Sequence, residues 1–192
     1  MNTGSESDIS CIILAGGEGR RVNGQDKGLV LYQDKPLIEH VIDRIRPQVD
    51  DIVISANRNL ATYRRYADNV ISDDRENYMG PLAGINACLP HCRHPLALIV
   101  ACDLPRLPDD LVNRLQSAMK HAEERVDVCI ATVDKRHQLT LLMRTDLQAG
   151  IAQRLTNNQL KLIEWVESQH YSTVSFDDST QAFANLNTLE QL

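Results

Sequence analysis

Glycines and basic side chains gather near the start of the sequence. Gly16 and Gly17 are followed by Arg20 and Arg21, and Lys27 comes shortly afterwards. Glycine lets backbone N–H groups turn toward an anion and approach it closely. Arginines bridge phosphate oxygens with paired donors, whereas a lysine supplies a mobile point charge. This order of residue types predicts a phosphate-binding loop in which Lys27, Arg20 and Arg21 stabilise charge during phosphoryl or nucleotidyl transfer.

Two better-known glycine loops do not match this segment. The dinucleotide fingerprint G-x-G-x-x-G fits Gly17 and Gly19 but then meets Val22, and the Walker A loop needs a Gly-Lys pair that the chain lacks. The remaining alternative is a flexible surface loop with scattered charge. Because the cluster directly follows the first apolar run, we favour the phosphate loop.

Asp103 is the second residue whose position suggests chemistry. It follows the most apolar run of the chain, residues 96–101. A hard carboxylate oxygen suits Mg²⁺, which usually takes one or two protein carboxylates together with substrate phosphates. The alternative is a turn or N-cap aspartate ahead of Pro105. We predict that Asp103 is catalytic and holds Mg²⁺, with Mn²⁺ as a second candidate.

Alternating strands and helices must hold these residues. Apolar, β-branched runs predict the strands, at 10–14, 51–55, 70–72, 96–101, 126–131, 137–144 and 172–176. Helical spacing predicts the helices, at 36–46, from 81 onward, at 111–119, at 145–153 and at 160–170. The alternation indicates an α/β three-layer sandwich with a mostly parallel, Rossmann-like sheet. Ligands bind at the carboxyl edge of such sheets, where the glycine loop and Asp103 should meet.

Size and charge limit the possible functions. The chain has 192 residues and a net charge of −6, so we expect one domain at 9–192, after a disordered segment at 1–8. The acidic balance argues against a nucleic-acid partner. There is no signal-like start and no apolar run of ~20 residues, so we expect no membrane partner. Five scattered cysteines are typical of buried free thiols in a cytoplasmic protein.

Several ordered motifs together resemble the molybdenum cofactor guanylyltransferases, members of the glycosyltransferase-A-like nucleotidyltransferases. The resemblance covers nearly the whole chain. The motifs are Leu-Ala-Gly-Gly at 14–17, Arg-Arg at 20–21, Asp-Lys-Gly-Leu at 26–29, Gly-Pro-Leu-Ala-Gly at 80–84, Cys-Asp-Leu-Pro at 102–105 and Asn-Leu-Asn-Thr at 185–188.

The resemblance implies transfer of GMP from GTP to the phosphate of molybdenum-molybdopterin, with release of pyrophosphate. It makes Asp103 the magnesium ligand and also implies a nucleotide site, formed by Leu14, Ala15, Gly16, Gly17, Lys27, Ser55, Asp73 and Asp103. This chain has Ser55 where the family commonly has asparagine, which changes one expected contact with the nucleoside.

The resemblance further implies an acceptor site, formed by Gly80, Pro81, Leu82, Gly84, His137, Asn185 and Asn187. Gln138 departs from the His-Pro pair that the family often has there. As partners we expect GTP and molybdopterin, and transient contacts with molybdopterin-handling proteins and molybdoenzyme chaperones. We expect the protein itself to be a monomer.

Three other functions stay open. Cytidylyltransferases share the chemistry, but they tend to read Leu-Ala-Ala-Gly, and Gly16 leaves room for a purine. Sugar-phosphate nucleotidyltransferases share the fold but usually have longer chains. A non-catalytic nucleotide or molybdopterin carrier would bind nucleotide without releasing pyrophosphate.

Overall fold

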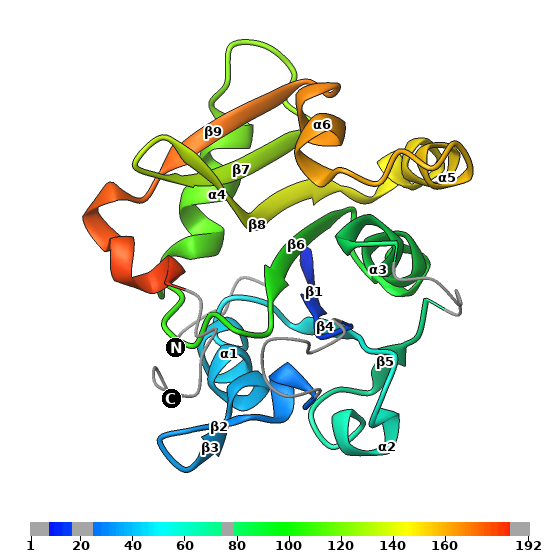
Figure 1. The fold of residues 1–192 in the computed structure, drawn as a ribbon. Coiled ribbons are helices and arrows are strands. Elements are labelled where there is room, and N and C mark those ends of the chain that lie inside the picture. The colour runs from blue at the N-terminus through cyan, green and yellow to red at the C-terminus, as the bar shows by residue number, and fades with distance from the viewer. Residues whose placement is uncertain (1–7, 17–24, 74–78, 185–192) are drawn as a thin grey trace.

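A mixed sheet forms the centre of the protein (Figure 1). The computed structural model describes residues 8–16, 25–73 and 79–184. The sheet has seven strands in the order β5-β4-β1-β6-β8-β7-β9. Their bounds are β1 (Ile9–Leu14), β4 (Asp51–Ser55), β5 (Asn69–Ile71), β6 (Leu96–Ala101), β7 (Val128–Val133), β8 (Arg136–Arg144) and β9 (Tyr171–Ser175).

The strands that lead to the carboxyl edge are parallel. β5, β4, β1 and β6 pair in parallel, and Leu14 at the end of β1 lies opposite Ser55 and Ala101. β1 and β6 are almost continuously apolar because helices cover both of their faces. β8 alone runs against its neighbours β6 and β7. The predicted α/β fold with a mostly parallel sheet is therefore confirmed.

Helices cover the sheet on both sides, which makes the three predicted layers (Figure 1). α1 and α4 pack their apolar stripes on one face, and α3, α5 and α6 pack on the other. The bounds are α1 (Leu37–Ile45), α2 (Leu60–Tyr63), α3 (Pro81–Cys88), α4 (Leu111–Lys120), α5 (Gln148–Thr156) and α6 (Leu162–Glu167). Among the described residues, no helix is long and apolar enough to cross a bilayer.

The segment between β1 and α1 contains structure that the sequence patterns did not reveal. It holds a short 3-10 helix, Lys27–Leu29, and a small antiparallel hairpin of β2 (Leu31–Tyr32) and β3 (Lys35–Pro36). Gln33 and Asp34 turn this hairpin with positive φ angles of 50° and 61°. Pro36, predicted as helical, ends β3 and precedes α1 because its extended backbone pairs with Leu31.

Two predicted helices in the last third of the chain are correct in type but wrong in extent. The helix predicted at 145–153 begins as a 3-10 turn, Thr145–Leu147, and becomes α-helical only from Gln148. The helix predicted at 160–170 is limited to α6. In both cases the apolar stripe continues into a local turn beyond the α-helix. Helical spacing in the sequence therefore does not locate the helix boundary. A further 3-10 segment, Asp177–Phe183, follows β9, and another, Leu89–His91, extends α3.

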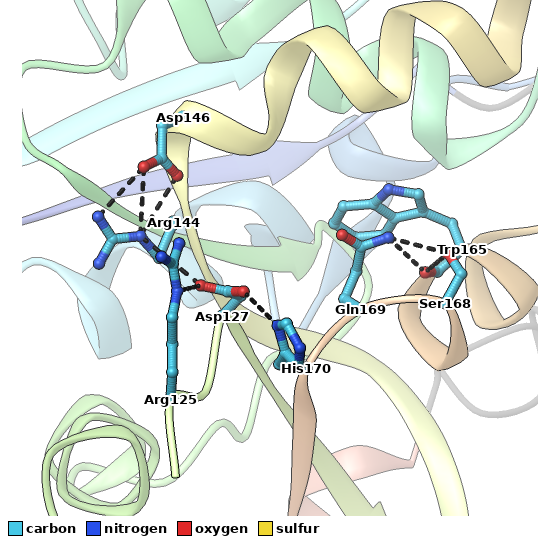
Figure 2. Close-up of polar contacts among 8 residues, drawn as sticks. All are labelled: Arg125, Asp127, Arg144, Asp146, Trp165, Ser168, Gln169 and His170. Atoms are coloured by element: carbon cyan, nitrogen blue, oxygen red, sulfur yellow. Dashed lines mark hydrogen bonds and ion pairs between the residues drawn. The ribbon is translucent and has the colours of Figure 1, made fainter.

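A buried carboxylate ties three strands together at the amino edge of the sheet (Figure 2). The Asp127 side chain is 7% exposed and accepts hydrogen bonds from Arg125 Nε at 2.7 Å and His170 Nδ1 at 3.1 Å. Arg144 Nε lies 3.8 Å away and also pairs with Asp146. Burial, the largest influence, raises the pKa of Asp127, but the donors of Arg125 and His170 outweigh it, so the pKa is lowered overall.

We expect Asp127→Asn to lower the free energy of unfolding by about 1–2 kcal/mol at pH 7, because Arg125 and Arg144 lose the charge of a buried partner. The pKa of Asp127 is lower in the folded than in the unfolded chain. Its contribution is therefore present above the unfolded pKa of about 3.9 and is lost as pH falls through the folded value. Urea unfolding from pH 7 to pH 3 measures both effects.

Asp146→Asn is the matched control, since the Asp146 side chain is 58% exposed and Arg144 is its only ion-pair partner among the described residues. Surface pairs of this kind contribute little, so its unfolding free energy should stay within about 0.5 kcal/mol of wild type. A difference between Asp127→Asn and wild type that does not shrink toward pH 3 would contradict the role given to the Asp127 charge.

Candidate active site

A cavity of about 400 Å³ opens at the carboxyl ends of β1, β4 and β6. It lies on the side of the sheet that α3 covers. Its walls are formed by Leu14, Ala15, Gly16, Lys27, Ser55, Asp73, Met79, Gly80, Pro81, Gly84, Ala101, Cys102, Asp103 and Leu139. The fold thus brings together most of the site residues predicted from the sequence, at the edge where they were expected.

Backbone hydrogen bonds join the ends of the three strands beneath this cavity. Ala15 N–H donates to Ser55 O at 2.8 Å, and Cys102 N–H donates to Leu14 O at 3.1 Å. The chain leaves the sheet just after these bonds, so the residues that follow β1 and β6 begin side by side. Asp103 consequently lines the same cavity as Gly16 although the two are far apart in sequence.

Lys27 and Asp103 form an ion pair in the cavity wall, with Lys27 Nζ against Asp103 Oδ2. Asp103 is only 5% exposed. Its other oxygen, Oδ1, is buried and has no hydrogen-bond partner among the described residues. Buried carboxylate oxygens normally accept hydrogen bonds, so this oxygen is available to bind a ligand.

Asp73 is held in the wall by the side chain of Asn57. The Asn57 amide nitrogen donates to Asp73 Oδ1 at 2.9 Å, and its oxygen accepts from the Asp73 and Ser72 donors, both at 3.1 Å. No role for Asn57 was predicted from the sequence. Asn57 follows β4 and Asp73 follows the neighbouring parallel strand β5, so the pairing of these two strands brings the side chains together.

Ser55 lies where α3 approaches β4 most closely. It is 2% exposed, and a Cβ added to Gly84 would stand 2.5 Å from Ser55 Oγ and 3.2 Å from Leu14 Cδ2. Real Cβ atoms do not approach so closely. A glycine at position 84 is therefore required for α3 to reach the cavity next to this serine.

The start of α3 forms the part of the cavity wall that contains Gly80, Pro81 and Gly84, which were predicted as acceptor residues. Gly80 has a φ of 70°, a conformation that favours glycine, and Pro81 begins the helix. A Cβ on Gly80 would lie 3.7 Å from Leu160 O, so the turn between α5 and α6 stands beside this entrance.

Not every predicted site residue reaches the cavity. Leu82 is fully buried and packs in the core with Ile12 and Val53. The His137 ring stacks edge-on against Tyr171 at 6.2 Å between centroids, and Leu139 lines the wall instead. Further predicted residues lie outside the described part of the chain; they are Gly17, Arg20, Arg21, Asn185 and Asn187.

The cysteines are unsuited to act as nucleophiles. All five are free, and Cys102, which borders the cavity, is buried. Burial first, and then the charge of Asp103, raise the pKa of the Cys102 thiol well above its ordinary value. Burial likewise raises the pKa of Cys88 and of Cys92 to about 12. Neutral thiols are poor nucleophiles, so the arrangement favours direct transfer rather than a covalent enzyme intermediate.

Comparison with known proteins identifies the family of this chain. The model of the MobA-like NTP transferase domain matches residues 11–172. The chain belongs to the MobA-like NTP transferase family.

Its relatives in this family extend over nearly the full chain. A molybdenum cofactor guanylyltransferase of Shewanella putrefaciens is 41% identical over 184 residues, which cover 95% of this chain and 93% of the relative. One from Shewanella piezotolerans is 40% identical over 184 residues, with 95% and 89% covered. The family and the nucleotidyltransferase class expected from the sequence are thus confirmed.

A solved structure shares the fold of this chain. The molybdopterin-guanine dinucleotide biosynthesis protein A of Archaeoglobus fulgidus superposes with a TM-score of 0.76 at 23% identity, covering 95% of this chain and 94% of that one. At this identity the likeness concerns the fold alone.

We predict that Gly84→Ala lowers the free energy of unfolding by about 1–3 kcal/mol, because the new methyl group overlaps Ser55 Oγ. Adding Ser55→Ala should recover part of the loss, since it removes the overlapping oxygen while Leu14 Cδ2 remains close. Chemical denaturation of the single and double variants measures both effects.

Gly150→Ala is the matched control. Gly150 lies inside α5, and a Cβ there would meet no atom within 4 Å. Because alanine favours helices more than glycine does, this variant should be as stable as wild type or more stable, by up to about 1 kcal/mol. Equal stability of Gly84→Ala and wild type would contradict the close approach of α3 to β4.

Proposed function

We propose that the protein transfers GMP from GTP to the phosphate of molybdenum-molybdopterin and releases pyrophosphate. Relatives that are about 40% identical to this chain are named molybdenum cofactor guanylyltransferases, and the match covers nearly their full length. The observation that carries the proposal is the Lys27–Asp103 pair in the cavity, with one buried Asp103 oxygen unsatisfied among the described residues. A cation beside a half-satisfied carboxylate suits a metal-bound triphosphate.

Asp103 would hold Mg²⁺ through Oδ1, with Mn²⁺ as a second candidate. The described residues contain no group of three or more His, Cys, Asp or Glu side chains that could hold a metal. A single carboxylate still fits Mg²⁺, which takes its other ligands from water and substrate phosphates. When bound, Mg²⁺ neutralises charge on the phosphate oxygens as the leaving group departs.

The chemical step needs no protein base. An anionic oxygen of the acceptor phosphate bonds to the α-phosphorus of GTP, and the bond from that phosphorus to pyrophosphate breaks with its electron pair. A phosphate monoester is already anionic near neutral pH, so no proton has to be removed. Lys27 would leave Asp103 for the substrate phosphates and stabilise the negative charge that develops there.

The two sides of the cavity suit the two substrates. The donor nucleotide would lie against the backbone of Leu14, Ala15 and Gly16, with Ser55 and Asp73 beside it, and Gly17 would extend this site. Among the described residues, the nearest atom to a Cβ added at Gly16 would be Asn57 Nδ2, at a distance of 3.5 Å. The acceptor would enter past Gly80 and Pro81.

Residues beyond the cavity wall complete the proposal. Arg20 and Arg21 would assist Lys27 at the phosphates, and Asn185 and Asn187 would bind the pterin. Leu82 would support the start of α3 from the core, on the proposed acceptor side. His137 would take part in acceptor binding only from outside the cavity. We further propose a cytoplasmic monomer that meets molybdopterin-handling proteins and molybdoenzyme chaperones transiently.

The direct test measures pyrophosphate release and the mass of the pterin product. Purified protein, Mg²⁺ and molybdate-loaded molybdopterin are mixed with GTP, CTP or ATP in separate reactions. We expect release with GTP alone and a product heavier by GMP. Preference for CTP would overturn the guanine assignment, and nucleotide binding without release would indicate a carrier.

In the same assay, Lys27→Ala should lower turnover by about 10²–10³-fold, because a positioned charge at the reacting phosphates is lost. Lys35→Ala is the matched control, since Lys35 also pairs with an aspartate, Asp43, but on the nearby β3 hairpin. It should keep nearly full activity. Equal turnover of Lys27→Ala and wild type, with both folded by circular dichroism, would exclude the role proposed for Lys27.

A further inference from the structure

The residue before Lys27 is a buried aspartate with two side-chain donors. Asp26 is 9% exposed. The Tyr63 hydroxyl donates to Asp26 Oδ1, and Asn59 Nδ2 donates to Asp26 Oδ2 at 3.1 Å. Both oxygens of this carboxylate are therefore used for contacts within the protein, unlike those of Asp103.

Both donors come from one short element. Tyr63 closes α2 and Asn59 precedes it, and Tyr63 N–H donates to Asn59 O at 3.2 Å. Residues four apart lie on one face of a helical turn, so both side chains reach the same carboxylate. Asn59 has a φ of 50°, a left-handed conformation that asparagine adopts more readily than most residues.

The residue after Lys27 touches the same phenol. A Cβ on Gly28 would stand 2.5 Å from the Tyr63 hydroxyl oxygen and 3.3 Å from two ring carbons. Tyr63 is fully buried in the core between α1 and the sheet. The residues on both sides of Lys27 thus contact one buried side chain.

The Tyr63 hydroxyl stays a donor over the whole physiological range. Burial above all, and then the nearby Cys102 and the hydrogen bond to Asp26, raise the pKa of Tyr63 well above its ordinary value. Ionisation therefore does not break the contact with Asp26.

We propose that Asp26, Tyr63 and Asn59 form a latch that positions Lys27 for catalysis. The lysine side chain is long and flexible, so its ammonium group is positioned precisely only if the backbone that carries it stays fixed. While the contacts of the latch hold the backbone, the Lys27 side chain alone moves from Asp103 to the substrate phosphates. The latch residues are positioning residues, and the proposal rests on the proposed function of the same site.

The test uses Tyr63→Phe in the full-length protein, because this change keeps the ring in the core and removes only the hydroxyl. We expect kcat for GMP transfer to fall about 10- to 100-fold, with KM for GTP changed less than about threefold. Asn59→Gly removes the second donor and retains positive φ. It should lower kcat in the same direction, and it tests the latch even if Tyr63→Phe fails to fold.

Tyr66→Phe is the matched control. Tyr66 lies just beyond α2, and its hydroxyl makes no hydrogen bond among the described residues, so kcat should be unchanged. A merely structural Tyr63 is distinguished by a double-mutant cycle. In the Lys27→Ala background, Tyr63→Phe should cause no further loss, whereas equal losses in both backgrounds would overturn the proposal.

A second readout is independent of activity. In protein with ¹³C-labelled lysine, the Lys27 side-chain NMR signal reports its pairing with Asp103, and Asp103→Asn identifies the position of the signal without the Asp103 charge. We expect Tyr63→Phe and Asn59→Gly to move the Lys27 signal toward that position, while Tyr66→Phe leaves it in place. An unmoved signal in the folded variants would refute the latch. Absence of transfer by the wild type would refute only the proposed function.

Discussion

The buried carboxylate of Asp103 is the group on which the arrangement of the site depends. A charge taken out of water is costly unless it is paired, and here Lys27 pairs with only one of its two oxygens. The parallel pairing of β1 with β6 makes this pair possible, because it ends both strands at one level with Leu14 opposite Ala101. The other oxygen is the one for which Mg²⁺ is proposed above.

The segment that follows β4 connects the parts of the cavity wall. Ser55 meets α3, Asn57 holds Asp73, and Asn59 holds Asp26. These side chains alternate along a few residues and reach three elements that are distant in sequence. A local distortion of this segment would therefore disturb Asp73 and the residue before Lys27 together.

The strands β7, β8 and β9 mainly support the sheet, and β8 also adds Leu139 to the cavity wall. β8 turns back from β7 through Asp134 and Lys135, whose φ angles of 49° and 62° suit a tight hairpin. This antiparallel strand carries Leu139 to the cavity and delivers Arg144 to the Asp127 cluster at the opposite edge (Figure 2). The cluster stabilises the sheet where no substrate is expected.

Local patterns in the sequence determined the main elements and the edge at which the site lies. The strands at 51–55 and 96–101 match the predicted bounds because a short apolar run between turn signals fits few other structures. The tertiary structure alone decided the rest. α2 and the β2–β3 hairpin are too short to leave a periodic pattern, and the contact of Tyr63 with Asp26 joins residues 37 apart. Periodicity records which face of an element is buried, whereas packing of the whole chain decides which side chains meet.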